Sequence, residues 1–260
     1  MLSLDQIKKY YPENLRSFER FLIREYLQCK ILEIIFDSKY ANQFAFIGGT
    51  ALRLIYGSER FSEDLDFDNF GLTPEVFSEM SSHIRTELEL EGYKVEIKNV
   101  ERGAFHYYIR FPKLLFESGL TEHSEEKILI RLDSEAQHFD FKPETVLLNR
   151  FDIFTEIKVT PGNILLAQKF YTVINRKRNK GRDFYDIVFL LGRNFKPDYG
   201  YLNLKLSIKN GIELKNRLLD KLEALNMEEM VEDVRPFLIN IKDEKKIRLF
   251  RALLEQAKLD

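Results

Sequence analysis

Cysteine is almost absent from this chain of 260 residues, since Cys29 is its only one. A single thiol excludes an internal disulfide and a zinc site built from cysteines, so we expect a reduced, cytoplasmic protein. Long hydrophobic runs are also missing, because no apolar stretch approaches the roughly 20 residues that a membrane-spanning helix needs. The first residues, MLSLDQIKKYYPENLR, lack the apolar core and cleavage site of a signal peptide. We therefore expect neither a membrane protein nor a secreted one.

A large excess of charge of one sign is missing as well. The chain has 40 Lys and Arg against 42 Asp and Glu, which leaves a formal net charge of −2. Such a balance argues against a general nucleic-acid coat and says nothing about a local basic patch. Hydrophobic residues make up 44% of the sequence, and 22 Phe and 12 Tyr are among its aromatic residues. This composition predicts a globular protein with a sizeable core rather than a disordered chain.

The hydrophobic pattern divides the chain into helical and strand-like segments. Helical spacing covers residues 5–37, with a break at Pro12, and residues 74–91, and it returns after Thr160 almost to the end. Thr160 and Pro161 resemble the N-cap and first residue of a helix. Short apolar or alternating runs between these segments predict strands at Phe44–Ile47, Asp64–Phe67, Lys94–Lys98, Tyr107–Phe111, Lys127–Asp133 and Glu156–Val159.

These elements predict an α+β fold with two domains. The first domain covers residues 1–160 and has a mixed β-sheet flanked by helices. The second covers residues 161–260 and is helical, with no flexible linker between the two.

The densest polar cluster joins a Gly-Gly turn to an Asp-x-Asp strand. Gly48 and Gly49 end the first predicted strand, and a short helix is expected over residues 50–56. Strand residues two apart share a face, so Asp64 and Asp66 present paired carboxylates. These repel each other unless a cation lies between them, and oxygen ligands suit Mg²⁺ or Mn²⁺. The glycines let the backbone approach a phosphate, whose charge the amides that open the helix favour. This combination points to phosphoryl or nucleotidyl transfer, although each motif alone also occurs in ordinary turns and strands.

A second group of charged residues follows Thr160. Lys169 and Arg176 are seven residues apart, which leaves them only about 20° from alignment on a helix. Asp183 and Asp186 are three apart and share a face of the next predicted helix. An ion-pair network on the surface is the alternative interpretation. The run from Arg176 to Arg182 contains five cations in seven residues, and it is either a solvated loop or a contact for RNA phosphates.

Together these residues resemble the signature of the AbiEii/AbiGii-type toxin nucleotidyltransferases, a branch of the DNA polymerase β-like superfamily. The segment FIGGTALRLIYGSERFSEDLDF contains the Gly-Gly turn, the short helix and the pattern Arg-x-Ser-x-Asp-h-Asp-h, where h is apolar. The later segment is similar to the family's helical Ala-x-Lys, followed by Arg and by Arg-Asp-x-x-Asp. The resemblance covers residues 44–70, 127–133 and 158–192.

The resemblance implies roles for individual residues. Asp64 and Asp66 are expected to bind metal ions, and Lys169 is expected to contact phosphates, where its charge stabilises the transition state. A third carboxylate is expected on a neighbouring strand, and Asp133 at the end of KILIRLD is the candidate general base or third metal ligand. Glu135 and Asp140 are the fallback candidates. The expected nucleotide-binding residues are Gly48, Gly49, Thr50, Arg60, Ser62, Lys169, Arg176, Arg182, Asp183 and Asp186.

The implied activity is a metal-dependent nucleotidyl transfer. An acceptor hydroxyl attacks the α-phosphate of an NTP bound with Mg²⁺ or Mn²⁺, and pyrophosphate leaves. The resemblance makes a tRNA 3′ end the leading acceptor and a separate, winged-helix-like antitoxin the expected partner. Two alternatives remain, namely the same chemistry on a protein side chain or on a small molecule such as an aminoglycoside, and a non-enzymatic nucleotide-binding module. The four histidines show no metal-ligand spacing, and we expect them to be structural or exposed.

Overall fold

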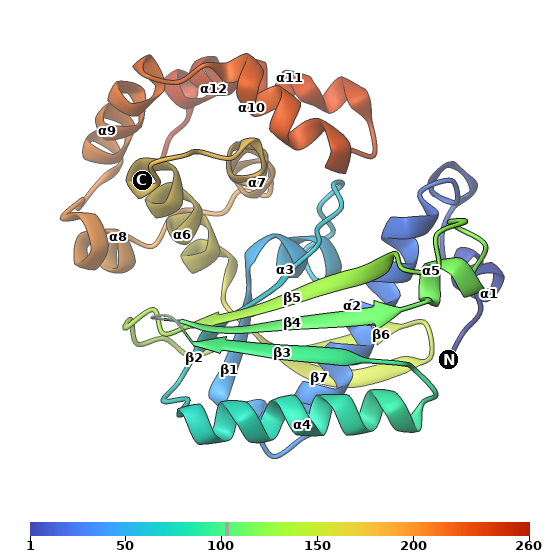
Figure 1. Ribbon diagram of the computed structural model, residues 1–260. Coiled ribbons are helices and arrows are strands. Elements are labelled where there is room, and N and C mark those ends of the chain that lie inside the picture. Colours follow the sequence, from blue (N-terminus) through green and yellow to red (C-terminus); the bar gives the residue numbers. More distant parts are fainter. Residues whose placement is uncertain (102–103) are drawn as a thin grey trace. The chain divides into compact units, whose positions relative to one another are not determined.

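The computed structural model describes residues 1–101 and 104–260 (Figure 1). Contacts within the chain divide it into two compact units. The second unit takes in two segments that precede the predicted boundary at Thr160. The first unit consists of Met1–Ala51, Ser62–His138 and Lys142–Val159, and the second of Leu52–Phe61, Phe139–Phe141 and Thr160–Asp260.

The first unit is built on a seven-stranded mixed sheet. Its strands are β1 (Phe44–Ile47), β2 (Leu65–Asn69), β3 (Glu96–Glu101), β4 (Phe105–Pro112), β5 (Lys127–Glu135), β6 (Glu144–Arg150) and β7 (Ile153–Val159). They lie in the order β3-β4-β5-β2-β1-β7-β6. Strand β2 pairs antiparallel with β1 and parallel with β5. Strand β1 is also parallel to β7, and the other neighbours are antiparallel. The predicted mixed sheet flanked by helices is confirmed.

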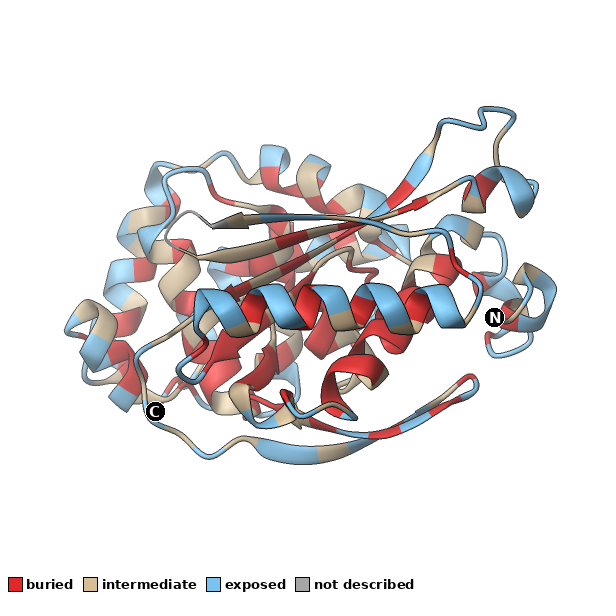
Figure 2. Ribbon diagram, turned by 60° about the horizontal axis from the view of Figure 1, so that its bottom comes forward, coloured by how far each residue is buried: buried red, intermediate tan, exposed pale blue. Residues whose placement is uncertain are grey.

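Two long helices cover one face of this sheet (Figure 1). Helix α2 (Glu19–Phe36) packs against β7, β5 and α4 (Pro74–Leu90), and most of its residues are buried. Helix α4 starts sharply because the Thr73 hydroxyl accepts a hydrogen bond from the amide of Val76 and proline follows at the first helical position. In Figure 2, α4 lies in front with buried and exposed residues alternating along it, as in an amphipathic helix. The shorter helices of this unit are α1 (Leu4–Lys8) and α5 (Leu114–Glu117).

Aromatic side chains fill the core beneath the sheet. Phe67 of β2 lies with its ring centroid 5.4 to 6.3 Å from those of Phe36, Phe44 and Phe46. All four rings are buried. Since side chains alternate along a strand, burying Phe67 on the helix-covered face directs its neighbour Asp66 to the opposite face. Packing of the core therefore decides which face carries the carboxylates.

The second unit is helical, as the sequence predicts. Helix α6 packs against α7, α8 and α9, and α7 also packs against α10 and α11. The helices are α6 (Gly162–Asn175), α7 (Gly181–Gly192), α8 (Tyr199–Leu206), α9 (Gly211–Glu223), α10 (Met227–Val234), α11 (Glu244–Arg248) and α12 (Phe250–Gln256). The segment Leu52–Phe61 joins them through a hydrogen bond from the amide of Phe61 to the carbonyl of Phe237.

Two predicted helix boundaries differ from the structure. The helix expected over residues 50–56 is α3 (Gly48–Leu54), so the glycines form its first turn instead of preceding it. Helix α6 begins at Gly162, with Pro161 at the N-cap position, and no side chain caps it in the described part of the chain. The predicted capping by Thr160 was wrong because the extended backbone of Pro161 places the helix start one residue later.

Strand β6 was missed by the sequence analysis. Its consecutive apolar residues Val146, Leu147 and Leu148 do not alternate with polar ones, and only Leu148 is buried. The strand forms at the edge of the sheet because a tight turn at Phe151, with φ of +60°, pairs it with β7. A pairing that depends on such a turn leaves no clear period in the sequence.

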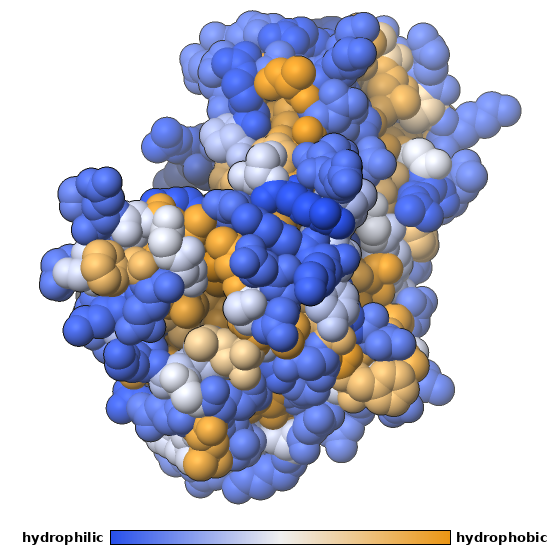
Figure 3. Space-filling model, turned by 90° about the vertical axis from the view of Figure 1, so that its right-hand side faces the viewer, coloured by the Kyte–Doolittle hydropathy of each residue, from blue (hydrophilic) through white to orange (hydrophobic). Residues whose placement is uncertain are grey.

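No helix in the described residues is long and apolar enough to cross a membrane. On the side of the molecule shown in Figure 3, patches of apolar surface are interrupted by hydrophilic side chains.

Replacing Phe67 by alanine tests the role of the aromatic core. We expect Phe67→Ala to lower the free energy of unfolding by about 3–5 kcal/mol, because it leaves a cavity at a side chain that is only 1% exposed. The matched control is Phe154→Ala on β7, where the ring is 65% exposed and the expected change is within about 0.5 kcal/mol. Denaturant unfolding measures both, and equal losses would contradict the proposed packing.

Candidate active site

The turn that opens α3 supports the Asp-x-Asp segment. Gly48 has a φ of +77°, and a Cβ atom on it would lie 2.2 Å from Oδ2 of Asp66. Only glycine tolerates both the left-handed backbone and this close approach. The Thr50 hydroxyl donates a hydrogen bond of 2.5 Å to the carbonyl oxygen of Asp64. The first turn of α3 thus holds the backbone of one aspartate and contacts the side chain of the other.

Three predicted carboxylates lie on the face of the sheet away from α2 and α4. In the parallel pair β2 and β5, Asp66 is directly opposite Asp133. Asp64 lies two residues before Asp66 and therefore extends the same row of side chains along the chain. The structure confirms that Asp133 ends up beside the Asp-x-Asp motif, about 67 residues further along the chain.

Arg131 lies between two of these carboxylates. Its Nη2 atom is 2.9 Å from Oδ2 of Asp64, and its Nε atom is 2.8 Å from Oδ2 of Asp133. Burial opposes its charge, but the carboxylates of Asp64 and Asp133 outweigh this and raise the pKa of the Arg131 guanidinium. The arginine therefore stays charged and offsets part of the repulsion among the aspartates.

His106 on β4 contacts the other oxygen of Asp133. Its Nδ1 atom lies 2.7 Å from Oδ1 of Asp133, in a register that places the two residues directly opposite each other. An ionised carboxylate only accepts hydrogen bonds, so Nδ1 is the nitrogen that carries the proton in this contact. No motif in the sequence identifies this residue, because only the pairing of β4 with β5 brings it to Asp133.

The carboxylates fit a hard divalent cation by their chemistry. Asp64, Asp66 and Asp133 supply only oxygen atoms, which are the ligands that Mg²⁺ and Mn²⁺ prefer. In residues 1–101 and 104–260, no three His, Cys, Asp or Glu side chains are already arranged to hold a metal ion. Two of these carboxylates, Asp64 and Asp133, contact the guanidinium of Arg131 instead.

The second unit contains a buried network of alternating charges. Lys169 on α6 lies 3.0 Å from Oδ1 of Asp183 and 2.8 Å from Oδ2 of Asp186, both on α7. Arg60 binds Asp186 with two hydrogen bonds, of 2.7 Å from Nε and 2.6 Å from Nη2. Arg176 binds the second oxygen of Asp183 at 2.6 Å. The expected clustering of these motif residues is therefore present. Arg60, Asp183 and Asp186 are buried, whereas Arg176 is exposed, so only part of this ion-pair network lies on the surface.

Charge complementarity explains how this network tolerates burial. Burial raises the cost of an ionised Asp186, yet the cations of Arg60 and Lys169 outweigh it and lower the pKa of this carboxyl. Burial likewise opposes the charge of Lys169, and the carboxylates of Asp186 and Asp183 still raise its pKa. Asp186 and Lys169 are therefore both charged at neutral pH.

The structure also locates the remaining predicted site residues. Ser62 is buried, and its backbone oxygen accepts a hydrogen bond from Gln28. Of the fallback carboxylates, Glu135 is exposed on β5, and Asp140 is exposed in the segment Phe139–Phe141. Gly49 lies in the first turn of α3. The roles of Gly49 and Ser62 in nucleotide binding, and those of Glu135 and Asp140 as fallback carboxylates, stay predictions.

The basic run covers the loop between α6 and α7 and the first two residues of α7. Its cations are partly engaged, since Arg176 binds Asp183, Lys180 lies 3.4 Å from Asp233, and Arg182 lies over the ring of Phe237. Lys177 and Arg178 are exposed. Most of the run is therefore a loop, as one of the two interpretations expected, and its contact with RNA stays a prediction.

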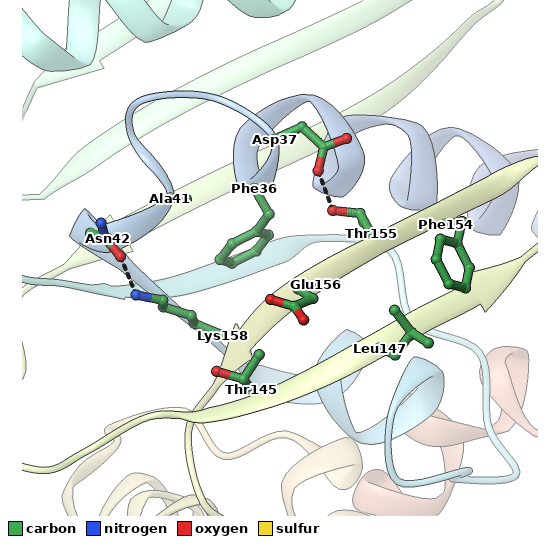
Figure 4. A pocket seen from close by; sticks show the side chains of 10 residues that line it. All are labelled: Phe36, Asp37, Ala41, Asn42, Thr145, Leu147, Phe154, Thr155, Glu156 and Lys158. Atoms are coloured by element: carbon green, nitrogen blue, oxygen red, sulfur yellow. Dashed lines mark hydrogen bonds between the residues drawn. The ribbon is translucent and has the colours of Figure 1, made fainter.

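A groove of about 660 Å³ lies elsewhere on the first unit, between the outer face of the β6–β7 hairpin and the end of α2 (Figure 4). Hydrogen bonds from Thr155 to Asp37 and from Lys158 to Asn42 cross it. Exposed Leu147 and Phe154 form part of its wall. None of the predicted site residues lines this groove.

Comparison with known proteins identifies the class of protein that this fold and these clusters define. Residues 30–256 match a family described as the nucleotidyl transferase AbiEii toxin of a type IV toxin–antitoxin system. The enzymes of this family are nucleotidyltransferases. The chain belongs to the AbiEii nucleotidyltransferase toxin family, which confirms the resemblance found in the sequence. Membership of a toxin–antitoxin family implies an antitoxin partner.

Solved structures share the fold. MenT4, a nucleotidyltransferase toxin from Mycobacterium tuberculosis, is 16% identical over 99% of this chain and 91% of its own, with a TM-score of 0.58. JHP933 from Helicobacter pylori is 18% identical over 92% of this chain and 93% of its own, with a TM-score of 0.55. At these identities the likeness concerns the fold alone. No curated protein matches the chain.

The contact between Gly48 and Asp66 can be tested with a matched pair of glycines. Gly48 and Gly71 both have a φ of +77°, but a Cβ on Gly71 meets nothing within 4 Å. We expect Gly71→Ala to cost about 1–2 kcal/mol from backbone strain. Gly48→Ala should cost about 1–3 kcal/mol more, because its Cβ also displaces the Asp66 carboxylate. Denaturant unfolding measures both losses, and equal losses would contradict the close approach.

Acid titration of stability tests the buried network. We expect Asp186→Asn to lower the free energy of unfolding by about 3–5 kcal/mol at pH 7, because Arg60 and Lys169 keep their buried charges. The lowered pKa of Asp186 means that its stabilisation is complete above the unfolded value of about 3.9 and disappears as pH falls through the folded value. The gap between the variant and the wild type should therefore close at acid pH. Exposed Asp220→Asn on α9 is the control, with a change within about 0.5 kcal/mol.

Proposed function

We propose that the protein transfers a nucleoside monophosphate from an NTP to a hydroxyl at a tRNA 3′ end, with a divalent cation and release of pyrophosphate. The observation that carries this proposal is that Asp66 on β2 lies opposite Asp133 on the parallel strand β5, with Asp64 just before β2 and the Gly48 turn beside Asp66. Family membership supports nucleotidyl transfer as the reaction. The cation, the nucleotide and the acceptor are parts of the proposal.

The proposed reaction assigns a task to each carboxylate. Asp64 and Asp66 hold the cation, Mg²⁺ or Mn²⁺, which when bound offsets the negative charge of the phosphate oxygens. Asp133 accepts the proton of the attacking hydroxyl and later passes it to solvent. The acceptor oxygen forms a bond to the α-phosphorus as the bond between this phosphorus and the bridging oxygen of pyrophosphate breaks. His106 and the backbone of β5 keep Asp133 oriented.

The second unit is proposed to supply positive charge for phosphates. Its network contains three cations, Arg60, Lys169 and Arg176, against the two carboxylates of Asp183 and Asp186, which leaves one positive charge. The Lys169 side chain is only 14% exposed, whereas that of Arg176 is 42% exposed. Arg176 is therefore the more accessible contact for a phosphate, and the exposed Lys177 and Arg178 beside it support binding of an RNA backbone.

A labelling experiment tests the reaction and the acceptor. The purified protein is incubated with each of the four NTPs labelled at the α-phosphate, with Mg²⁺ or Mn²⁺, and with total RNA or a protein extract. We expect label in RNA of tRNA size. Asp66→Asn should reduce it by about 100-fold or more, as should Asp133→Asn. Asp5→Asn near the N-terminus controls for the loss of a carboxylate.

Each other result excludes part of the proposal. If label appears only in protein or only in a small molecule, that molecule and not tRNA is the acceptor. Nucleotide binding without any transfer would indicate a non-enzymatic module. Full activity in the presence of EDTA would exclude the cation. If Asp133→Asn stays active and Glu135→Gln does not, Glu135 is the third carboxylate.

The antitoxin is proposed to be a small winged-helix-like protein. A neighbouring gene for such a protein, and its rescue of growth when both genes are expressed, would support this partner. Rescue by a neighbouring protein of unrelated fold would exclude a winged-helix-like antitoxin and would leave the proposed reaction unchanged.

A further inference from the structure

The Arg131 guanidinium has the charge and the contacts of a cation in the carboxylate cluster. It reaches Asp64 on the segment before β2 and Asp133 on its own strand, at 2.9 and 2.8 Å. Asp64 is one of the two residues proposed to hold the divalent cation, and Asp133 is the candidate for a third ligand. A divalent cation bound to these carboxylate oxygens would lie close to the guanidinium, and the two positive charges would repel each other.

These ion pairs are exchangeable, unlike those of the second unit. The side chains of Arg131, Asp64 and Asp133 are 42%, 31% and 23% exposed, so water reaches part of each, while Nε of Arg131 itself is buried and makes no hydrogen bond within the described part of the chain. The pair of Arg60 with Asp186 is 2% and 0% exposed by the same measure. Ion pairs that water reaches contribute little stability, whereas opening a buried pair leaves an uncompensated charge. The contacts of Arg131 can therefore open at little cost.

Asp133 keeps a second partner when Arg131 leaves. Arg131 contacts Oδ2 of Asp133, while His106 contacts Oδ1 from the neighbouring strand β4. Each carboxylate oxygen thus has its own partner. His106 can hold the orientation of Asp133 while Oδ2 exchanges the guanidinium for another cation.

We infer that Arg131 is a built-in counter-ion that competes with the divalent cation for Asp64 and Asp133, and that His106 is the positioning residue that holds Asp133 during the exchange. This inference rests on the proposed cation-dependent function. In the absence of the cation, the guanidinium limits repulsion among the aspartates. When the cation binds, the guanidinium is displaced, so the apparent affinity for the cation is lower than the carboxylates alone would provide.

Mn²⁺ binding without nucleotide tests this competition directly. The free Mn²⁺ signal is followed by electron paramagnetic resonance as the full-length protein is titrated. We expect Arg131→Gln to bind Mn²⁺ about 5- to 30-fold more tightly than the wild type, because two exposed ion pairs no longer compete. Unchanged or weaker binding by Arg131→Gln would overturn the inference.

A matched control separates competition from the general effect of removing a positive charge. Arg110 lies on the same face of β4 as His106, and its guanidinium lies over the ring of Tyr108. Arg110→Gln removes one positive charge near the cluster and leaves the contacts of Arg131 in place. We expect its Mn²⁺ affinity to change less than twofold. If both variants gained Mn²⁺ affinity equally, the loss of positive charge in general would explain the gain, and the inference of competition would be overturned.

The role of His106 predicts a change in the opposite direction. We expect His106→Ala to weaken Mn²⁺ binding about 10- to 100-fold, as loss of a residue that orients a metal ligand does, with no fall in melting temperature. His106→Asn retains a donor and should restore part of the affinity. Unchanged binding in His106→Ala would exclude the positioning role.

The failure of the proposed function looks different from the failure of this inference. If neither the wild type nor Arg131→Gln binds Mn²⁺, cation dependence itself is wrong, and the inference falls with it. If the wild type binds Mn²⁺ and labels RNA but Arg131→Gln binds no more tightly, only the inference is overturned.

Discussion

Repulsion among carboxylates on one face of a sheet is the constraint on which the first unit depends. The parallel pairing of β2 with β5 places Asp66 beside Asp133, and the buried aromatic cluster around Phe67 keeps both on the opposite face. Arg131 and His106 then contact the two oxygens of Asp133. A few elements thus hold together charges that would separate in an unfolded chain.

The second unit also holds charged side chains close together, but most of them are buried and paired with opposite charges. Asp186 has no exposed surface and depends on Arg60 and Lys169, which surround it with hydrogen bonds and opposite charge. Such a network is structural, because removing one member leaves the others uncompensated. The ion pairs of Arg131 are more exposed than this network. The proposed reaction requires this difference, since a cluster that exchanges cations needs contacts that open readily. The continuous motif from Gly48 to Asp66 serves both units, because its Arg60 belongs to the second and its aspartates to the first.

Much of this organisation could be predicted from local patterns. The strand-like run Lys127–Asp133 lies within β5, which continues to Glu135, and Asp183 and Asp186 both contact Lys169 from α7 as their spacing indicated. The predicted helical position of Arg176 was wrong, because α6 ends at Asn175 and Arg176 reaches Asp183 from the extended C-cap. His106 and Arg131 were not found, because neither belongs to a motif and each acquires its contact through a strand register. Strand β6 was missed for a related reason, since a turn and a partner strand produce it rather than a periodic pattern.

Local sequence patterns were enough to predict most helices and strands, the division between a sheet and a helical region, and which aspartates could act as metal ligands. These follow from periodicity and from side-chain chemistry, which act over a few residues. Tertiary structure alone decided which cation each carboxylate meets, which ion pairs are buried, and that Gly48 must lack a side chain. The physical reason is that charge pairing and close approach depend on distances between residues far apart in the chain, and only the folded register sets those distances.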